Sequence, residues 1–203
     1  PNLALDVALW TATSVIAQAS HIPGLSVSVN LTPRLFKDDQ TTQRLGEFIT
    51  AHGLDPARLV AEAPSATVFA DPDTGVARIK ALRELGISVV LDEFGLGAFS
   101  IDALVRMEAT GVKVAADFTH ATIASAQAAQ IMRGLTFLAS GAGLSLTAAG
   151  VDTGAQWLAM NTFRFQHLQG RAVSALVTRE GLLARLRASS APDAAGLSEH
   201  VRA

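Results

Sequence analysis

The chain has 203 residues, of which 49% are hydrophobic and 17% are charged, and its formal net charge is −2. This length and apolar content suffice for one sizeable folded domain, while the near-neutral charge offers no basic surface for DNA, RNA or an anionic membrane. The absence of cysteine excludes disulfides and thiolate metal sites, and no apolar run reaches the roughly 18 residues of a membrane span.

The ends of the sequence suggest how it is organised. Because the sequence begins with Pro1, we expect a piece of a longer protein. It shows no signal peptide, and its lack of cysteine fits a cytoplasmic location. We assign residues 1–187 to one domain. Residues 188–203 are small, polar and contain proline and glycine, so we expect a flexible tail or linker there.

Helical and strand patterns alternate along the chain. In order, they predict helix 3–19, strand 25–30, helix 38–53, strand 59–63, helix 73–86, strand 88–92, helix 100–111, strand 112–115, helix 126–143, strand 144–149, helix 153–160, strand 163–168 and helix 179–188. Gly53 is a typical helix stop, and Asp71 followed by Pro72 is a typical helix start. Short apolar strands that alternate with helices are typical of a parallel sheet covered on both faces.

This pattern fits either an incomplete (β/α) barrel or a doubly wound sheet. A full barrel typically needs about 250 residues, so a barrel reading implies that about two strands are missing. An incomplete barrel has unpaired sheet edges. We therefore expect another chain, another domain or a rearranged N-terminal helix to cover the gap.

Polar residues follow several of the expected strands. They are Asn30, Glu62, Asp92, Glu93, Lys113 and Gln169. Sites in parallel α/β folds form at the carboxyl ends of strands, so these side chains are expected to meet there. Hard oxygen ligands suit Mg²⁺, Mn²⁺ or Ca²⁺, and the lysine could face a phosphate oxygen or an attacking water. The plainer alternative is that strands end in polar residues because loops contact water.

The adjacent acids Asp92 and Glu93 raise a specific question. They end an apolar run and precede a glycine-rich turn, in the segment VVLDEFGLGAFS at 89–100. Two neighbouring carboxylates repel each other and lose solvation on burial. A cation, a hydrogen-bond network or exposure to water must offset that cost.

Six segments, in the same order and spacing over nearly the whole chain, resemble motifs of the EAL-domain cyclic di-GMP phosphodiesterases. They are SVSVNLTPRLF (like S-V-N-L-S-P-R), LVAEAPSA (like L-E-I-T-E-S), VVLDEFGLGAFS (like A-L-D-D-F-G-T-G-Y-S-S), GVKVAADF (like L-K-I-D-R-S-F), LTAAGVDT (like V-A-E-G-V-E-T) and FQHLQGRAV (like D-Y-V-Q-G-Y-L-F). Each motif alone is weak. Together they indicate the fold strongly.

The resemblance implies a modified (β/α)8 TIM-like barrel that hydrolyses cyclic di-GMP with two divalent metals, Mg²⁺ or Mn²⁺, and an activated water. By this resemblance, four residues match positions that contact metal: Asn30, Glu62, Asp92 and Glu93. It makes Lys113 the match to a lysine near the attacking water. It makes three residues candidate ligand contacts: Gln169, Phe94 and Asp152.

Departures from the family pattern bear on activity. The Glu-Ala-Leu signature segment lies before residue 1, and Ser65, Ala115 and Ala149 stand where the family has carboxylates. Because a two-metal site needs several carboxylates to balance its charge, we predict that metal binding is weak or lost and that Lys113 is vestigial. We therefore expect a degenerate domain with little or no phosphodiesterase activity.

Three functions remain open on the sequence. A domain without activity can still bind cyclic di-GMP, and since the chain has no tyrosine, base stacking would fall to Phe94, Phe99 or another phenylalanine. The domain can instead act as a regulatory interaction module with a protein partner or as a homodimer. The third reading is a weakly active phosphodiesterase, which the retained Lys113 and the matches to metal ligands favour.

Overall fold

The computed structural model describes residues 25–97 and 99–189, together with residues 7, 10, 14, 17 and 22. The strands are β1 (Val27–Asn30), β2 (Leu59–Pro64), β3 (Ser88–Phe94), β4 (Gly111–Val114), β5 (Ser145–Ala148) and β6 (His167–Leu168). The helices are α2 (Pro33–Lys37), α3 (Gln40–His52), η1 (Pro56–Arg58), α4 (Ser65–Ala70), α5 (Pro72–Glu84), α6 (Ile101–Arg106), α7 (Ala116–Ala124), α8 (Ala126–Gly141), α9 (Gly154–Thr162) and α10 (Arg179–Ser189).

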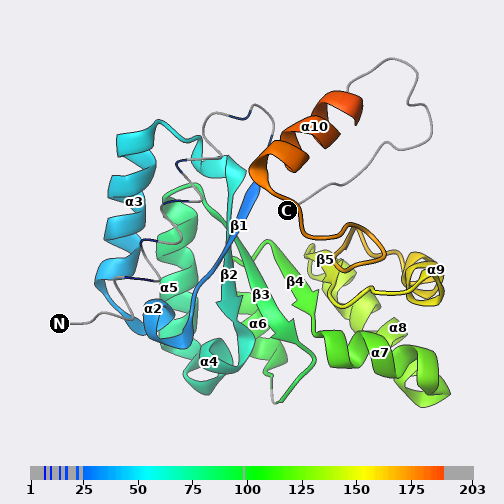
Figure 1. Ribbon diagram of the computed structural model, residues 1–203. Helices are drawn as coiled ribbons and strands as arrows, with labels where there is room; N and C mark the ends of the chain where they lie inside the picture. Colours follow the sequence, from blue (N-terminus) through cyan, green and yellow to red (C-terminus); the bar gives the residue numbers. More distant parts are fainter. Residues whose placement is uncertain are drawn as a thin grey trace.

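The six strands form one parallel sheet in the order β1-β2-β3-β4-β5-β6. Each strand pairs with the next one along the chain, with helices between them (Figure 1). A doubly wound sheet reverses its strand order part-way, and this sheet does not. The arrangement is therefore part of a (β/α) barrel with strands missing, as predicted. Within the described residues, β1 and β6 are the two open edges.

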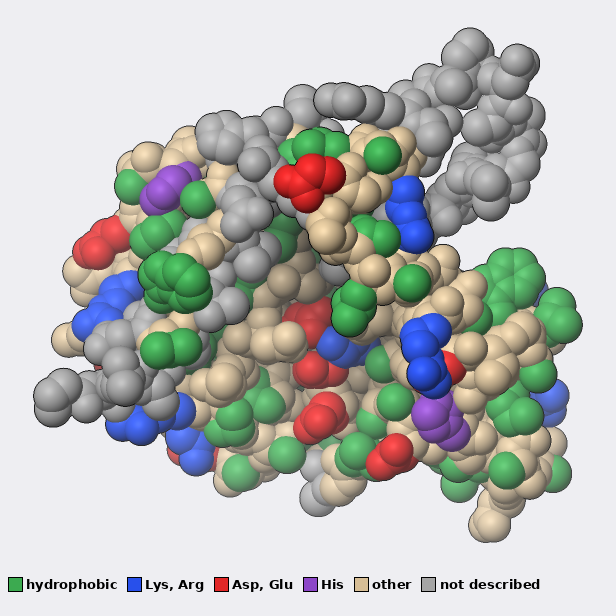
Figure 2. All heavy atoms as spheres, viewed as in Figure 1, with side chains coloured by type: hydrophobic (Ala, Val, Ile, Leu, Met, Phe, Trp, Pro, Cys, Tyr) green, Lys and Arg blue, Asp and Glu red, His purple; other side chains and the backbone are tan. Residues whose placement is uncertain are grey.

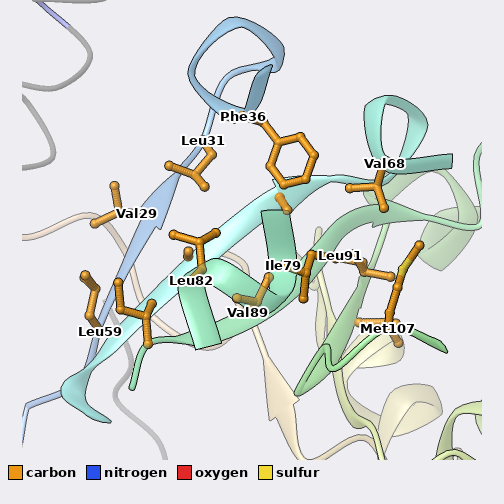
Figure 3. Close-up of a cluster of buried hydrophobic side chains, with 14 of the residues drawn as sticks. Val29, Leu31, Phe36, Leu59, Val68, Ile79, Leu82, Val89, Leu91 and Met107 are labelled. Atoms are coloured by element: carbon orange, nitrogen blue, oxygen red, sulfur yellow. The ribbon is translucent and has the colours of Figure 1, made fainter. Parts of the chain in front are cut away.

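Helices cover the outer face of the sheet. Val29 and Leu91 point from the strands toward helix side chains such as Phe36, Ile79 and Leu82, and all five are buried (Figure 3). Burying a side chain of this size stabilises the fold by about 1.5–3 kcal/mol. The outer face therefore supplies most of the core and sets the register of the strands.

Within the described residues, the inner face mixes small polar side chains with apolar ones such as Val60 and Val90. On β1 the outward valines are buried while Ser28 and Asn30 are exposed. Ser145 and Thr147 occupy the inward positions of β5. Barrel interiors are usually filled by bulky branched side chains. Here the small inward residues leave a hollow of about 340 Å³.

Several predicted boundaries need correction. Strand 163–168 shrinks to β6 because α9 continues to Thr162 and Arg164 has a left-handed φ of 60°. The helix expected at 100–111 ends at Arg106. Four short helices, α2, η1, α4 and α7, were not predicted. Apart from four of its residues, the helix expected at 3–19 lies outside the described residues, as does the tail beyond residue 189. No described helix is long and apolar enough to cross a membrane.

Candidate functional site

The carboxyl ends of β2, β3 and β4 bring one cation and two anions into contact. Lys113 Nζ forms an ion pair and a hydrogen bond with Glu62 Oε2, and it lies 3.1 Å from Asp92 Oδ1. We call these three residues the Lys113 cluster. The side chains of Lys113 and Glu62 are 9% and 10% exposed, and that of Asp92 is 21% exposed. Acidic and basic side chains gather near the centre of the face shown in Figure 2.

A β-bulge explains the two adjacent acids. Leu91 pairs with Val112 and Phe94 pairs with Val114, so two residues of β3 stand opposite Lys113 alone. Such a bulge re-aims side chains and is common at strand ends near functional sites. It lets Leu91 and Phe94 both remain in the core although they are three residues apart.

The bulge gives the two acids different environments. Asp92 contacts Lys113, and its Oδ1 also accepts a hydrogen bond from the Glu93 backbone N–H at 2.8 Å. Glu93 has a left-handed φ of 54° and is exposed to solvent. The repulsion between the acids is therefore offset by a cation for Asp92 and by solvent for Glu93.

Burial and charge act in opposite directions on Lys113. Desolvation is the largest single influence on the pKa of Lys113 and lowers it. The attraction and hydrogen bonds of Glu62 and Asp92 together outweigh that burial, so the pKa lies above its ordinary value. Lys113 is therefore a charged ammonium across the physiological range.

A second ion pair lies on the loops after β5 and β6. The Arg171 backbone N–H donates to Asp152 Oδ1 at 2.9 Å, and the Arg171 guanidinium lies 3.3 Å from Asp152 Oδ2. The backbone hydrogen bond is the main reason why the pKa of Asp152 is lowered, with the guanidinium and His120 adding to it. Asp152 is therefore an anion already held by a cation.

Asn30 and Gln169 also reach the hollow. Asn30 pairs in register with Glu62 across β1 and β2, and both residues line the hollow. Gln169 follows β6, where its backbone N–H donates to the Ala148 carbonyl at 2.9 Å, and it lines the hollow too. The structure thus brings Asn30, Glu62 and Gln169 to one concavity, from both open edges of the sheet.

Phe94 is not at this concavity. It is 1% exposed and belongs to the core, where its ring lies 6.3 Å from that of Phe69 and 5.3 Å from that of Phe99. Its expected role as a ligand contact has no support in this geometry. Phe99 is 43% exposed.

The three positions that lack carboxylates surround the same strand ends. Ser65 is buried, and its hydroxyl donates to the Glu93 carbonyl at 3.3 Å. Ala115 is buried at the N-cap of α7, and Ala149 directly follows β5. Among the described residues, no group of three or more His, Cys, Asp or Glu side chains is placed to hold a metal ion. The described donor set does not fit a two-metal centre.

Sequence reasoning missed two features of this region. It did not foresee that Lys113 contacts both carboxylates, because that depends on the bulge in β3. It also missed the pairing of Asp152 with Arg171. The only sequence signal for either was the broken alternation at Leu91, Asp92, Glu93 and Phe94.

Comparison with known proteins places the chain in a family. The model of the EAL domain matches residues 1–175. The chain belongs to the EAL domain family. This EAL domain is 26% identical over 159 residues to the bifunctional diguanylate cyclase/cyclic di-GMP phosphodiesterase MucR of Pseudomonas aeruginosa, a match that covers 78% of the chain and 23% of MucR. The chain spans about a fifth of the length of the curated relatives it matches.

Solved structures confirm the fold. The phosphodiesterase PaMucR in complex with cyclic di-GMP superposes with a TM-score of 0.85 at 22% identity, covering 89% of this chain and 75% of that one. A calcium and cyclic di-GMP complex of Klebsiella pneumoniae BlrP1 gives a TM-score of 0.74 at 24% identity, covering 82% of this chain and 43% of that one. At these identities the likeness establishes the barrel architecture and leaves the chemistry to the residues of this chain.

Proposed function

We propose that this EAL domain is a regulatory module of bacterial cyclic di-GMP signalling that does not hydrolyse the dinucleotide. The observation that carries the proposal is the lack of carboxylates around the Lys113 cluster, where Ser65, Ala115 and Ala149 stand at positions that hold acids in the family pattern. Ala115 and Ala149 supply no ligand atoms from their side chains at the neighbouring strand ends. A cytoplasmic module that reads or relays a signal needs the fold and surface of the domain and no catalytic metal.

Binding of cyclic di-GMP is one way in which such a module can act. The hollow of about 340 Å³ is lined by Asn30 and Gln169, which offer amide donors and acceptors, and by several serine and threonine hydroxyls. Asp152 and Arg171 lie on the loops at the same end of the sheet. These groups suit the guanine edges and phosphates of a dinucleotide, with Gln169 and Asp152 as its proposed contacts.

Contact with a protein partner or a second copy is the other way. The segment after β3 and helix α6 expose large apolar side chains: Leu96 and Phe99 are each 43% exposed, Ile101 is 57% exposed and Val105 is 75% exposed. Apolar side chains that crowd one stretch of surface are typical of interaction sites. This segment begins directly beyond Asp92 and Glu93, so a partner bound there would sense the state of the site.

One observation favours a second function, a weakly active metal-dependent phosphodiesterase. Asn30, Glu62 and Asp92 occupy the ends of three adjacent strands, as oxygen ligands for Mg²⁺ or Mn²⁺ would. The neighbours in known structures include a calcium complex and a manganese complex of BlrP1.

Two measurements on the purified chain test the proposal. In the first, cyclic di-GMP is incubated with the protein and Mg²⁺ or Mn²⁺, and linear product is quantified by chromatography. We expect no more product than from the Glu62→Gln/Asp92→Asn variant, which serves as the matched control. Turnover that the wild-type chain shows and this variant lacks would overturn the proposal in favour of the phosphodiesterase.

The second measurement is calorimetric titration of cyclic di-GMP into the folded chain, in Ca²⁺ and again in EDTA. Micromolar or tighter binding assigns the module to cyclic di-GMP sensing, and Gln169→Ala is then expected to weaken it. An absence of binding by folded protein assigns it to protein interaction. A pull-down that compares the wild-type chain with Val105→Asp is then the next experiment.

A further inference from the structure

We infer that Phe99 is a positioning residue that holds the connection between β3 and α6 against helix α4, through contacts of its ring with Phe69 and Phe94. All three rings belong to the chain itself, so the contact forms without a bound ligand. The inference goes beyond the proposed function, because it concerns how one part of the surface is held and involves no nucleotide, metal or partner.

The backbone after β3 does not fix its own course. Glu93, Gly95 and Gly97 have left-handed φ angles of 54°, 97° and 81°. Glycine has the widest choice of φ and loses the most conformational freedom when it is ordered. The turn is closed by a hydrogen bond from the Leu96 N–H to the Glu93 carbonyl, which is long at 3.3 Å. A side-chain contact is therefore needed to hold the connection in one conformation.

Three phenylalanine rings supply that contact. The ring of Phe99 lies 5.3 Å from that of Phe94 at an angle of 49°, and 6.2 Å from that of Phe69 at an angle of 62°. The rings of Phe69 and Phe94 are 6.3 Å apart, so the three form a closed triangle. Centroid distances of about 4.5–7 Å with tilted or edge-on planes are the favoured geometry of aromatic pairs. We call these three residues the Phe99 triad.

The Phe99 triad joins three elements. Phe69 lies on α4 and Phe94 ends β3, and α4 packs against β3 (Figure 1). Phe99 directly precedes Ser100, whose hydroxyl caps α6 by accepting a hydrogen bond from the Ala103 N–H at 3.2 Å. An apolar residue just before a helix cap commonly fixes the angle at which the chain enters the helix. Phe99 is therefore placed to set the orientation of α6 relative to α4.

The burial of the three rings differs. Phe94 is 1% exposed and is held by the core, Phe69 is half-buried, and Phe99 is 43% exposed. Of the three, only Phe99 lies on the connection. The motif A-L-D-D-F-G-T-G-Y-S-S, which this segment resembles, has phenylalanine at the position of Phe94 and serine at that of Phe99. The contact of Phe99 is thus a feature of this chain and not of the family motif.

The test measures amide hydrogen exchange by nuclear magnetic resonance on the full 203-residue chain, without nucleotide or metal. The reporters are the N–H groups of Leu96, Ala103 and Leu104, which donate hydrogen bonds in and just after the connection. We expect Phe99→Ser to speed exchange at these amides at least about fivefold, while amides of β2 and β4 keep their wild-type rates. Phe137→Ser is the matched control, since Phe137 on α8 is 83% exposed, and it should change none of these rates.

Two further variants separate a ring contact from a general loss of packing. Phe99→Tyr keeps the ring and should exchange like the wild type. Phe69→Leu removes the ring on α4. In combination with Phe99→Ser it should add little to the effect of Phe99→Ser alone, because both substitutions remove the same contact.

Three results would overturn the inference. One is a Phe99→Ser chain whose reporter amides exchange at wild-type rates. Another is an equal rise across β2 and β4, since Phe99 would then stabilise the whole domain and not the connection. The third is a pair of effects from Phe69→Leu and Phe99→Ser that multiply, because the two rings would then act independently. If Phe99→Ser does not fold, Phe69→Leu is judged by the first two criteria.

Discussion

Removal of the buried ammonium is expected to destabilise the domain more than removal of either carboxylate. Lys113→Met leaves Glu62 and Asp92 facing each other with no cation, in a place where Glu62 is 10% exposed and Asp92 is 21% exposed. Breaking a buried ion pair in this way costs about 3–5 kcal/mol of unfolding free energy. Glu62→Gln leaves Lys113 paired with Asp92, and its amide oxygen still accepts a hydrogen bond, so we expect a loss of about 1–2 kcal/mol.

The double variant Lys113→Met/Glu62→Gln measures the coupling directly. It leaves only Asp92, the most exposed member of the cluster, without a partner. We therefore expect its loss of stability to fall short of the sum of the two single losses by about 1–3 kcal/mol. Lys80→Met on the exposed side of α5 is the matched control and should change stability by less than about 0.5 kcal/mol.

Urea unfolding at neutral pH, followed by far-ultraviolet circular dichroism, provides the free energies. The variants must share one dependence on denaturant for their midpoints to be compared. The reasoning fails if Lys113→Met costs no more than Glu62→Gln. It also fails if the two losses simply add to within about 0.5 kcal/mol, because the three charges would then act independently.

Two further predictions concern the inner face and its rim. A Cβ on Gly111 would lie 2.2 Å from Ser145 Oγ. Gly111→Ala should therefore lower the free energy of unfolding in urea by about 1–3 kcal/mol. Gly134→Ala, which adds its Cβ in open space on α8, should raise that free energy by about 0.5–1 kcal/mol. Equal effects would contradict the close pairing of β4 and β5. The lowered pKa of Asp152 stabilises the fold above the ordinary carboxyl pKa and ceases to do so as pH falls. Asp152→Asn should therefore melt below the wild type at neutral pH, and the gap should close below about pH 4; a constant gap would show that Arg171 does not interact through charge.

The sequence predicted the sheet well because the outer face carries a simple signal. Buried aliphatic side chains recur on β2, β3 and β4, and the helix start at Asp71 is confirmed by its hydrogen bond from the Thr74 N–H at 3.3 Å. Gly53 ends α3 with the left-handed φ of 60° that a helix stop requires. The side chains that line the inner hollow could not be predicted, since they depend on which residues the tertiary structure turns inward.

The candidate site was predictable in position but not in contacts. Strand ends fix where Asn30, Glu62, Asp92 and Lys113 lie, because parallel strands end at one edge of the sheet. The partner of Lys113 depends on the extra residue in β3, and a sequence pattern does not reveal which pair of strands contains a bulge. The expectation that Lys113 faces a phosphate or a water therefore remains a prediction about a liganded state.

The outer face of this sheet is stabilised by apolar packing, and the inner face requires its buried charges to be paired. The outer face needs only apolar side chains of suitable volume, so the barrel architecture persists at 22% identity to PaMucR. The inner face has to balance charge locally, because Glu62 and Lys113 are nearly buried. An ammonium from within the chain satisfies the two carboxylates of the Lys113 cluster.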